Sequence, residues 1–234
     1  MQRTQKYTFE WLNDLSRMMF PKNCCSCGIS LHKKEEIICL SCLAKLPRTN
    51  YHRLKPSPIQ KRFDGRIPVD QATSFLSFRR GNQAQKLLHE LKYRGRQDIG
   101  EFLGGLFGAD LAKDGFTTPD VIIPLPLHPA KQALRGYNQC HSISRGIRRY
   151  LGGELLLNGV RRKVHNQTQT SKTRFERWMN VEQIFEVAEP GKIIARHVLI
   201  IDDVVTTGST LEACGRKLLE SGARSLSLAT LASA

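Results

Sequence analysis

Val198-Leu199-Ile200-Ile201-Asp202-Asp203-Val204-Val205-Thr206-Thr207-Gly208-Ser209-Thr210 is the stretch that decides the fold of this 234-residue chain. Four apolar residues predict a buried strand, and two carboxylates follow at its carboxyl end. A loop of small residues comes next, and residues 209–221 have the apolar spacing of an amphipathic helix. Ser209 and Glu212 match a capping box, which predicts that the helix starts there. The stretch therefore predicts a strand, a loop and a helix in succession.

The chemistry of this segment favours a phosphorylated sugar. A helix N-terminus offers unpaired N–H groups and the positive end of a dipole to a phosphate. Small residues let the anion approach the backbone, while Asp202 and Asp203 can accept hydrogen bonds from neighbouring sugar hydroxyls. The glycine patterns of a P-loop and of a dinucleotide fingerprint are both missing. The segment thus indicates a ribose 5-phosphate, against the plainer interpretation of a strand, a turn and two solvated acids.

Strands and helices alternate in the rest of the chain after residue 70. The expected strands are residues 72–78, 120–124 and 225–231, and the expected helices are 82–93, 98–113 and 139–150. Such alternation is typical of an α/β fold with a largely parallel sheet. We expect a domain over 71–234, a linker rich in proline, glycine and charge over 51–70, and a separate module over 1–50.

The amino-terminal module carries two Cys-x-x-Cys pairs. Cys24 and Cys27 form the first pair, Cys39 and Cys42 the second, and 11 residues separate them. This spacing predicts a closed, tetrahedral and structural Zn²⁺ site, with disulfides and an iron–sulfur cluster as the alternatives. Cys25 is expected to be a bystander.

The chain carries 36 Lys and Arg against 21 Asp and Glu, a net charge of +15, with 13 of the basic residues in the first 66. A positive surface of this kind attracts polyanions, of which nucleic acid is the commonest, although it could also steer phosphorylated small molecules. No apolar run is long enough for a membrane span, and no secretory signal is recognisable, so a cytoplasmic protein is expected.

Several motifs together carry a family resemblance. They are the cysteine pairs, the Asp202–Thr210 segment and three further runs: Lys92-Tyr93-Arg94-Gly95, Pro124-Leu125-Pro126-Leu127-His128 and Arg135-Gly136-Tyr137-Asn138-Gln139. The Asp202–Thr210 segment resembles the phosphoribosyl pyrophosphate (PRPP) motif of type I phosphoribosyltransferases. With the zinc module, nearly the whole chain resembles the ComF family of competence proteins.

The resemblance implies roles for particular residues. Asp202 and Asp203 would hold the ribose hydroxyls, and the loop and helix start would hold the 5-phosphate through Thr206, Thr207, Gly208, Ser209 and Thr210. A loop from Leu125 toward Arg135 would grip the pyrophosphate together with Mg²⁺. Lys131 and Arg135 would supply its countercharges, and residues 161–180 would form a flexible loop that brings Lys172 or Arg174 to the leaving group.

The function implied is that of a ComF-type protein of DNA uptake and natural transformation, which binds PRPP with Mg²⁺ and also binds single-stranded DNA. The basic run Arg161, Arg162 and Lys163 is the candidate contact for nucleic acid. Two alternatives stay open: a catalytically active phosphoribosyltransferase of the nucleobase-salvage or amidophosphoribosyl type, and a non-enzymatic zinc adaptor that contacts other competence proteins.

Overall fold

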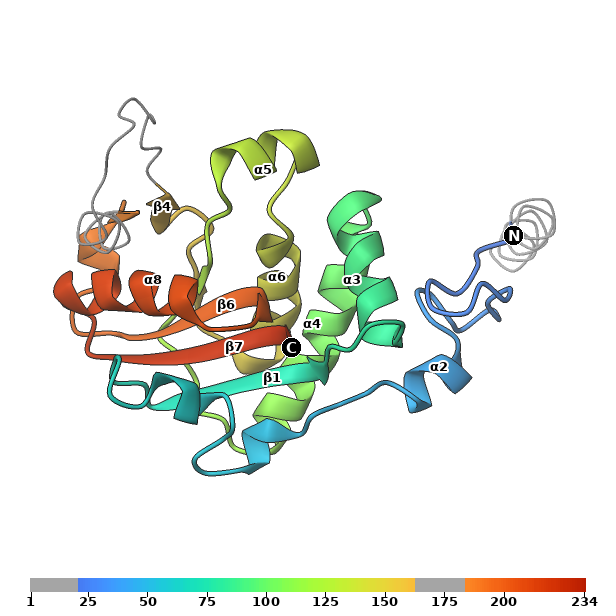
Figure 1. Ribbon diagram of the computed structural model, residues 1–234, viewed down its shortest axis with the longest axis horizontal. Helices are drawn as coiled ribbons and strands as arrows, with labels where there is room; N and C mark the ends of the chain where they lie inside the picture. Colours follow the sequence, from blue (N-terminus) through green and yellow to red (C-terminus); the bar gives the residue numbers. More distant parts are fainter. Residues whose placement is uncertain (1–20, 163–183) are drawn as a thin grey trace, which may run out of the picture. The chain divides into compact units, whose positions relative to one another are not determined.

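The structure is a computed structural model that describes residues 21–162 and 184–234. The chain divides into two compact units, Met1–Leu46 and Pro47–Ala234. The first contains the cysteine pairs and the short helix α2 (Leu40–Ala44). The second contains a five-stranded sheet with its helices, shown in Figure 1. Among the described residues, no helix combines the length and the apolar character that crossing a bilayer requires.

The elements of the second unit follow one another in the order expected of an α/β fold. Two 3₁₀ helices come first, and the complete order is η1 (Tyr51–Arg53), η2 (Gln60–Phe63), β1 (Gln71–Ser77), α3 (Gln83–Tyr93), α4 (Gln97–Lys113), β2 (Val121–Pro124), α5 (Pro129–Arg135), α6 (Gln139–Leu151), β3 (Glu154–Leu155), β4 (Val160–Arg162), β5 (Phe185–Val187), η3 (Pro190–Lys192), β6 (His197–Val205), α8 (Ser209–Glu220) and β7 (Ser225–Ser233).

The main sheet has the strand order β1-β7-β6-β2-β3, and every neighbouring pair is parallel. The expected parallel sheet is therefore confirmed. β4 and β5 form a separate antiparallel pair. β3, β4 and β5 are not predicted from the sequence, because strands of two or three residues carry no recognisable period.

Helices cover both faces of the sheet. Leu211, Cys214 and Leu218 of α8 pack against alternate residues of the central strands, such as Ile123 and Ile200. The intervening strand residues point to the other face, where α4 and α6 lie (Figure 1). Since Val198 to Ile201 have no exposed surface, β6 runs through the middle of the core.

The order of connections places a topological switch point beside β6. The chain leaves β2 through α6 toward β3, whereas it leaves β6 through α8 toward β7 on the other side. The carboxyl ends of β2 and β6 are therefore at a switch point of the sheet, where ligands of open α/β folds bind. Asn138 reinforces this edge, because its side chain caps α6 and donates to the Leu125 carbonyl oxygen at 3.0 Å.

Residues 51–70 belong to the second unit, whereas the sequence reading expected a linker there and a boundary after residue 50. Ile59, Phe63 and Ile67 recur every fourth position and are buried in the core on the α8 side. The prolines and charges between them obscured this apolar spacing. The segment also brings Arg62 and Arg66 to the loop that follows β6.

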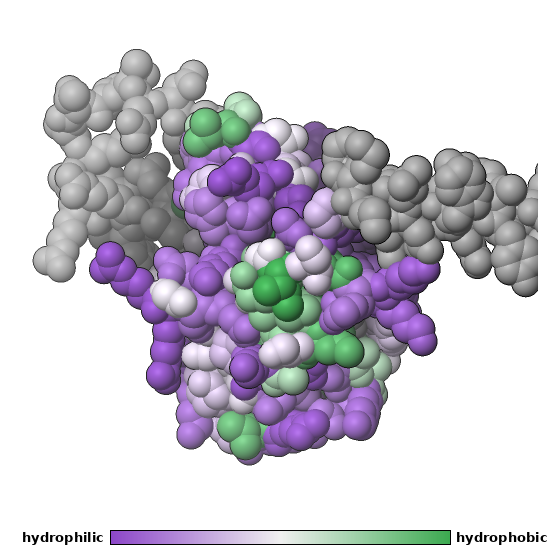
Figure 2. Space-filling view, turned by 90° about the vertical axis from the view of Figure 1, so that its right-hand side faces the viewer, coloured by the Kyte–Doolittle hydropathy of each residue, from purple (hydrophilic) through white to green (hydrophobic). Residues whose placement is uncertain are grey.

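One face of the described part of the protein is mainly polar. The face seen in Figure 2 is mostly hydrophilic, with limited hydrophobic areas. This agrees with the large excess of basic residues in the sequence.

Glycines allow α4 and α6 to meet backbone to backbone. Gly104 faces the Ile143 carbonyl oxygen so closely that an added Cβ would lie 2.3 Å from it, and at Gly146 the Cβ would lie 2.3 Å from the Glu101 carbonyl oxygen. Contacts this short leave no room for any side chain. By contrast, a Cβ at Gly105 would meet its nearest neighbour, the Tyr150 ring, at an ordinary 3.5 Å.

We therefore expect Gly104→Ala to lower the free energy of unfolding by about 1–3 kcal/mol through overpacking. The control Gly105→Ala sits in the same helix, where alanine is favoured over glycine, so it should be neutral or stabilising by up to about 1 kcal/mol. Urea unfolding of both variants measures the difference. Equal stability of the two proteins would contradict the close contact.

Candidate functional site

Two neighbouring carboxylates, Asp202 and Asp203, lie near the carboxyl end of β6, beside the switch point of the sheet. Asp203 is buried, and its Oδ2 receives a hydrogen bond from the Gln139 side chain at the start of α6. The same oxygen forms an ion pair of 2.9 Å with Lys92 Nζ at the end of α3. A buried carboxylate needs such partners to remain charged, and here they come from two different helices.

Asp202 is compensated less completely. Its Oδ1 accepts the Asp203 backbone N–H at 2.7 Å and lies 3.6 Å from the Cys140 thiol. Burial, followed by the negative charge of Asp203, raises the pKa of Asp202 to about 7. Burial and both acids also raise the pKa of the Cys140 thiol well above its usual value, so it stays protonated beside them. Asp202 therefore titrates near neutral pH.

Two of the motifs quoted above meet at these acids. Lys92 and Tyr93 end α3, and Arg135 stacks on the Tyr93 ring with its guanidinium carbon 5.5 Å from the ring centre. Arg135 also donates a hydrogen bond to Gln139, the residue that binds Asp203. The sequence reading gave Lys92 and Gln139 no role. Both residues lie in motifs that carry the family resemblance, and this was the signal that could have identified them as site residues.

The loop after β6 leads directly into α8. Thr206, Thr207, Ser209 and Thr210 are exposed, whereas Gly208 is buried with φ +79°. An added Cβ at Gly208 would lie 2.7 Å from the Phe63 ring, so glycine is required for both its φ angle and its packing. The loop keeps its polar groups at the surface while its centre is fixed to the core.

The expected capping box at the start of α8 is wrong. Gly208 is the N-cap, Ser209 is the first helical residue, and no side chain caps the helix. Glu212 pairs instead with Arg66 and, at 3.0 Å, with Arg216. Sequence spacing alone could not show that an arginine from residues 51–70 competes for this carboxylate. The first turn of α8 consequently lacks an N-cap side chain, although the Ser209 N–H donates a long hydrogen bond of 3.4 Å to the Thr207 hydroxyl oxygen.

Two arginines from residues 51–70 bind the backbone of the loop between β6 and α8. Arg62 donates to the Thr206 carbonyl oxygen, and Arg66 donates to the Thr207 carbonyl oxygen at 2.8 Å. These carbonyl oxygens would otherwise repel an approaching anion. With the open helix N-terminus, the arrangement can accept a phosphate group.

The segment expected to grip a pyrophosphate contains the short helix α5. Lys131 and Leu134 on this helix are exposed, and Lys131 makes no hydrogen bond or ion pair with the described residues. Of the three expected catalytic residues, the structure thus connects only Arg135 to the acids, through Gln139. Arg174 lies outside the described residues.

The basic run at β4 is divided by the structure. Arg161 is exposed, whereas Arg162 is partly buried over the Phe185 ring, with its guanidinium carbon 5.7 Å from the ring centre. Burial lowers the pKa of Arg162, and the charge of Asp202 opposes that shift. Arg162 is therefore within the electrostatic reach of Asp202. Lys163 lies outside the described residues.

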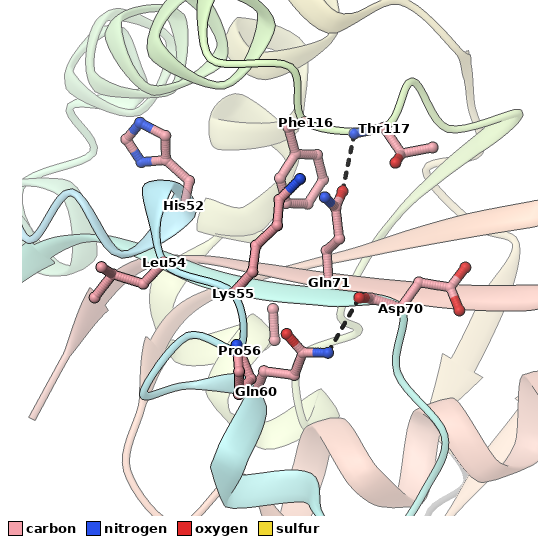
Figure 3. A pocket seen from close by; sticks show the side chains of 10 residues that line it. His52, Leu54, Lys55, Pro56, Gln60, Asp70, Gln71, Phe116 and Thr117 are labelled. Carbon is pink, nitrogen blue, oxygen red and sulfur yellow. Dashed lines mark hydrogen bonds between the residues drawn. The ribbon is translucent and has the colours of Figure 1, made fainter.

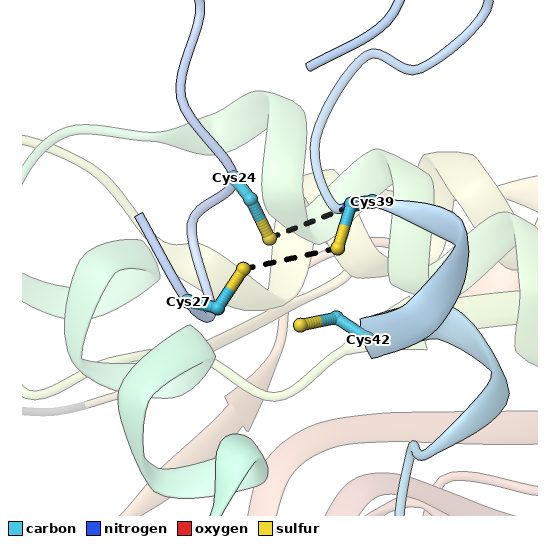
Figure 4. A group of neighbouring side chains, drawn as sticks. All are labelled: Cys24, Cys27, Cys39 and Cys42. Carbon is cyan, nitrogen blue, oxygen red and sulfur yellow. Dashed lines mark hydrogen bonds between the residues drawn. The ribbon is translucent and has the colours of Figure 1, made fainter. Parts of the chain in front are cut away.

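The four expected cysteines converge in the first unit (Figure 4). Their sulfur atoms all lie within 4.8 Å of one another, and the Cys27 and Cys39 sulfurs are 3.8 Å apart. A tetrahedral zinc ion with bonds of about 2.3 Å would separate its sulfur ligands by about 3.8 Å. The cluster is compatible with zinc, and Cys25 is not part of it.

Ionisation within this cluster is uneven. Burial raises the pKa of Cys24, but backbone N–H groups, among them that of Cys39 at 3.3 Å, outweigh burial and lower it to about 6. Burial raises the pKa of Cys42 to about 12. A divalent cation would remove the penalty of placing several thiolates together.

A hollow of about 440 Å³ lies at the other end of the sheet, beside the start of β1. Figure 3 shows the Lys55 side chain extending along Phe116 and Gln71, with Gln71 accepting a hydrogen bond from the Thr117 N–H at 2.9 Å. None of the expected site residues lines it.

Comparison with known proteins shows what these features are similar to. Residues 146–234, which include β6, the loop and α8, match the family described as phosphoribosyl transferase domain. A structure of glutamine PRPP amidotransferase from B. subtilis is similar with a TM-score of 0.44 and 19% identity, over 61% of this chain and 30% of that one. That likeness is too low to support an argument.

Curated relatives give a consistent set of names. Competence protein F of Haemophilus influenzae is 36% identical over 50% of this chain and 51% of its own length. DNA utilization protein YhgH of Escherichia coli K12 is 32% identical over 58% and 61%. Competence protein ComFC of Bacillus subtilis is 27% identical over 87% of both chains.

The alignments to the first two relatives thus span only about half to three fifths of those proteins. Together with the matching domain and the parallel sheet, these relatives confirm both the fold class and the resemblance drawn from the motifs. The chain is similar to competence proteins of the ComF type and contains a phosphoribosyltransferase-like domain, which a cysteine cluster compatible with zinc precedes in the sequence.

Proposed function

We propose that the carboxyl end of β6 and the loop that follows it bind PRPP together with Mg²⁺. The observation that carries the proposal is the succession, on one strand–loop–helix unit, of two adjacent carboxylates and a helix N-terminus whose N-cap is a glycine. The acids suit the ribose, and the first turn of α8 suits its 5-phosphate.

The free oxygens of the two acids support a diol. The hydrogen bonds and ion pairs that Asp202 makes with described residues use Oδ1, and those of Asp203 use Oδ2. Each carboxylate therefore keeps one oxygen for a ligand. Two acceptors on adjacent residues match two neighbouring sugar hydroxyls.

Mg²⁺ fits the same site. It prefers oxygen ligands and is usually bound through one or two carboxylates together with substrate phosphates. Asp202 and Asp203 are the carboxylates available, and the ion would neutralise the charge of the pyrophosphate. Lys131 and Arg135 are the proposed countercharges from the chain itself.

We expect Asp202→Asn to weaken PRPP binding by about 10-fold to 100-fold, because a charged acceptor of a hydroxyl hydrogen bond is lost. Titration calorimetry with PRPP and Mg²⁺ measures the affinity. Glu220→Gln, at the exposed far end of α8, is the control for loss of one negative charge. Unchanged affinity in Asp202→Asn would refute the site.

The same titration has a predictable pH dependence. With a pKa of about 7, Asp202 takes up a proton as the pH falls and loses an acceptor for the ribose. Affinity should therefore fall between about pH 8 and about pH 6, and this part of the fall should disappear in Asp202→Asn. A proton on PRPP itself affects both proteins alike, so their difference isolates the aspartate.

We further propose that the cysteine cluster is a structural zinc site formed by Cys24, Cys27, Cys39 and Cys42. Four thiolates close the coordination sphere and leave no position for a substrate. The described part of the first unit buries few large apolar side chains, among them Ile37, Ile38 and Leu46. A unit of this size usually needs a metal or disulfides to be stable.

We expect Cys39→Ser to lose the zinc and to unfold the amino-terminal unit, while Cys25→Ser keeps both. Metal analysis of the purified proteins gives the zinc content, and limited proteolysis reports on the unit. One zinc per chain in Cys39→Ser, or its loss in Cys25→Ser, would show that the ligand set is different.

The proposed cellular role is DNA uptake in natural transformation, with binding of single-stranded DNA. The support is the net charge of +15 and the names of the relatives, two of which are competence proteins and one a DNA utilization protein. Arg161 and Arg162 are proposed contacts, with Lys163 beyond them in the sequence.

We expect the wild-type protein to bind a labelled oligothymidylate, since basic residues release counterions from phosphates. The affinity should fall steeply between about 50 mM and about 200 mM salt. Fluorescence anisotropy measures this dependence. Absence of binding at low salt would remove single-stranded DNA from the proposed function and leave the PRPP site untouched.

A further inference from the structure

The carboxyl-terminal end of α6 borders a second hollow, which no motif had indicated. It has a volume of about 500 Å³ and is lined by Arg145, Arg148, Arg149, Gly152, Gly153 and Leu155. We call these residues the arginine hollow. Three of its six residues are cationic, and none is acidic.

The arginines lie on one side of the helix, because residues spaced by three and four positions are neighbours on its surface. All three are exposed. Arg145 has an acid nearby, Glu101, at a loose 3.7 Å. Arg148 donates to the Gly153 carbonyl oxygen at 3.1 Å, and Arg149 makes no ion pair with the described residues.

Other arginines in this part of the fold are neutralised. Arg196 pairs with Glu154 at 2.8 Å, and Arg224 pairs with Asp120 at 3.0 Å. Unlike the arginines of the hollow, these two arginines each have a carboxylate at close range. The uncompensated positive charge is therefore specific to the arginine hollow among these neighbouring arginines. A concentrated cationic concavity favours an anionic ligand.

Favourable interaction with the helix dipole explains basic residues in the last turn of α6, but not the hollow beside them. Gly152 and Gly153 have φ angles of +79° and +87°, and they place a turn without side chains next to the guanidinium groups. The turn therefore adds no side chain that would cover the arginines.

We propose that the arginine hollow binds the phosphate backbone of single-stranded nucleic acid. This rests on the proposed function, to which it adds a location. Several adjacent cations suit successive phosphates of one strand. Tyr150, the next residue along α6, is 52% exposed and offers an aromatic ring for stacking against a base.

The hollow and the acids are at opposite ends of the same helix. Gln139 begins α6 beside Asp203, and Leu151 ends it beside the hollow. A helix of this length spans about 18–20 Å. Nucleic acid bound to the arginines is therefore expected to leave the proposed PRPP site accessible, so that the chain can hold both ligands at once.

The test compares two double variants with the same charge change. Arg148→Gln with Arg149→Gln removes two cations from the hollow, and Lys55→Gln with Lys61→Gln removes two exposed cations elsewhere. Anisotropy with a labelled oligothymidylate should show at least about a 10-fold loss of affinity in the first variant. Its slope of log K against log salt should flatten by about 1.4, at about 0.7 for each phosphate that the variant no longer neutralises.

The lysine control should lose much less affinity, and calorimetric PRPP binding should be unchanged in both. Arg149→Gln alone, at a position without described contacts, gives a second variant that should keep the fold and show part of the loss. Equal affinity of the arginine variants and wild type would overturn the hollow while leaving DNA binding in place. If the wild-type protein bound no oligonucleotide, both the arginine hollow and the proposed binding of single-stranded DNA would be refuted.

Competition with inorganic phosphate separates a small-anion site from a strand-binding site. We expect the oligonucleotide to bind far more tightly than phosphate does. Equal affinity for phosphate, measured by calorimetry on wild type, would overturn the assignment to nucleic acid.

Discussion

The placement of two carboxylates side by side at the end of a buried strand is the constraint on which the site depends. Adjacent negative charges in a poorly solvated place repel each other, and the fold compensates one of them fully. Lys92 and Gln139 bind Asp203, so the ends of α3 and α6 have to meet at β6. Burial and the negative charge of Asp203 raise the pKa of Asp202, which has fewer partners. Binding chemistry and helix packing are thus linked through one residue pair.

Much of the fold follows from local pattern. The apolar run before Asp202 predicts β6, and the spacing of leucines and phenylalanines predicts α3 and α4 to within one or two residues. These elements are long and strongly periodic. Prolines and charged residues surround Ile59, Phe63 and Ile67 and obscure their apolar spacing. The sequence therefore predicts a linker where the structure has a packed segment.

The site was less accessible to sequence reasoning. Asp202, Asp203 and the loop after them are contiguous, so one motif carries them. Lys92 and Gln139 are 47 residues apart in the sequence, and only the sheet topology brings them to the same carboxylate. The capping box failed for a related reason: a remote arginine, Arg66, binds Glu212 more closely than the local backbone does. Tertiary partners overrode local signals in both cases.

The glycine contact between α4 and α6 has a consequence for how the molecule responds to its ligands. With the two backbones in direct contact, neither helix can slide or tilt without steric overlap. The distance between the two ends of α6 is consequently fixed. The Gln139 amide lies at its first residue, and the guanidinium groups of the arginine hollow lie near its last. A ligand bound at one end of α6 therefore need not change the positions of the side chains at the other end.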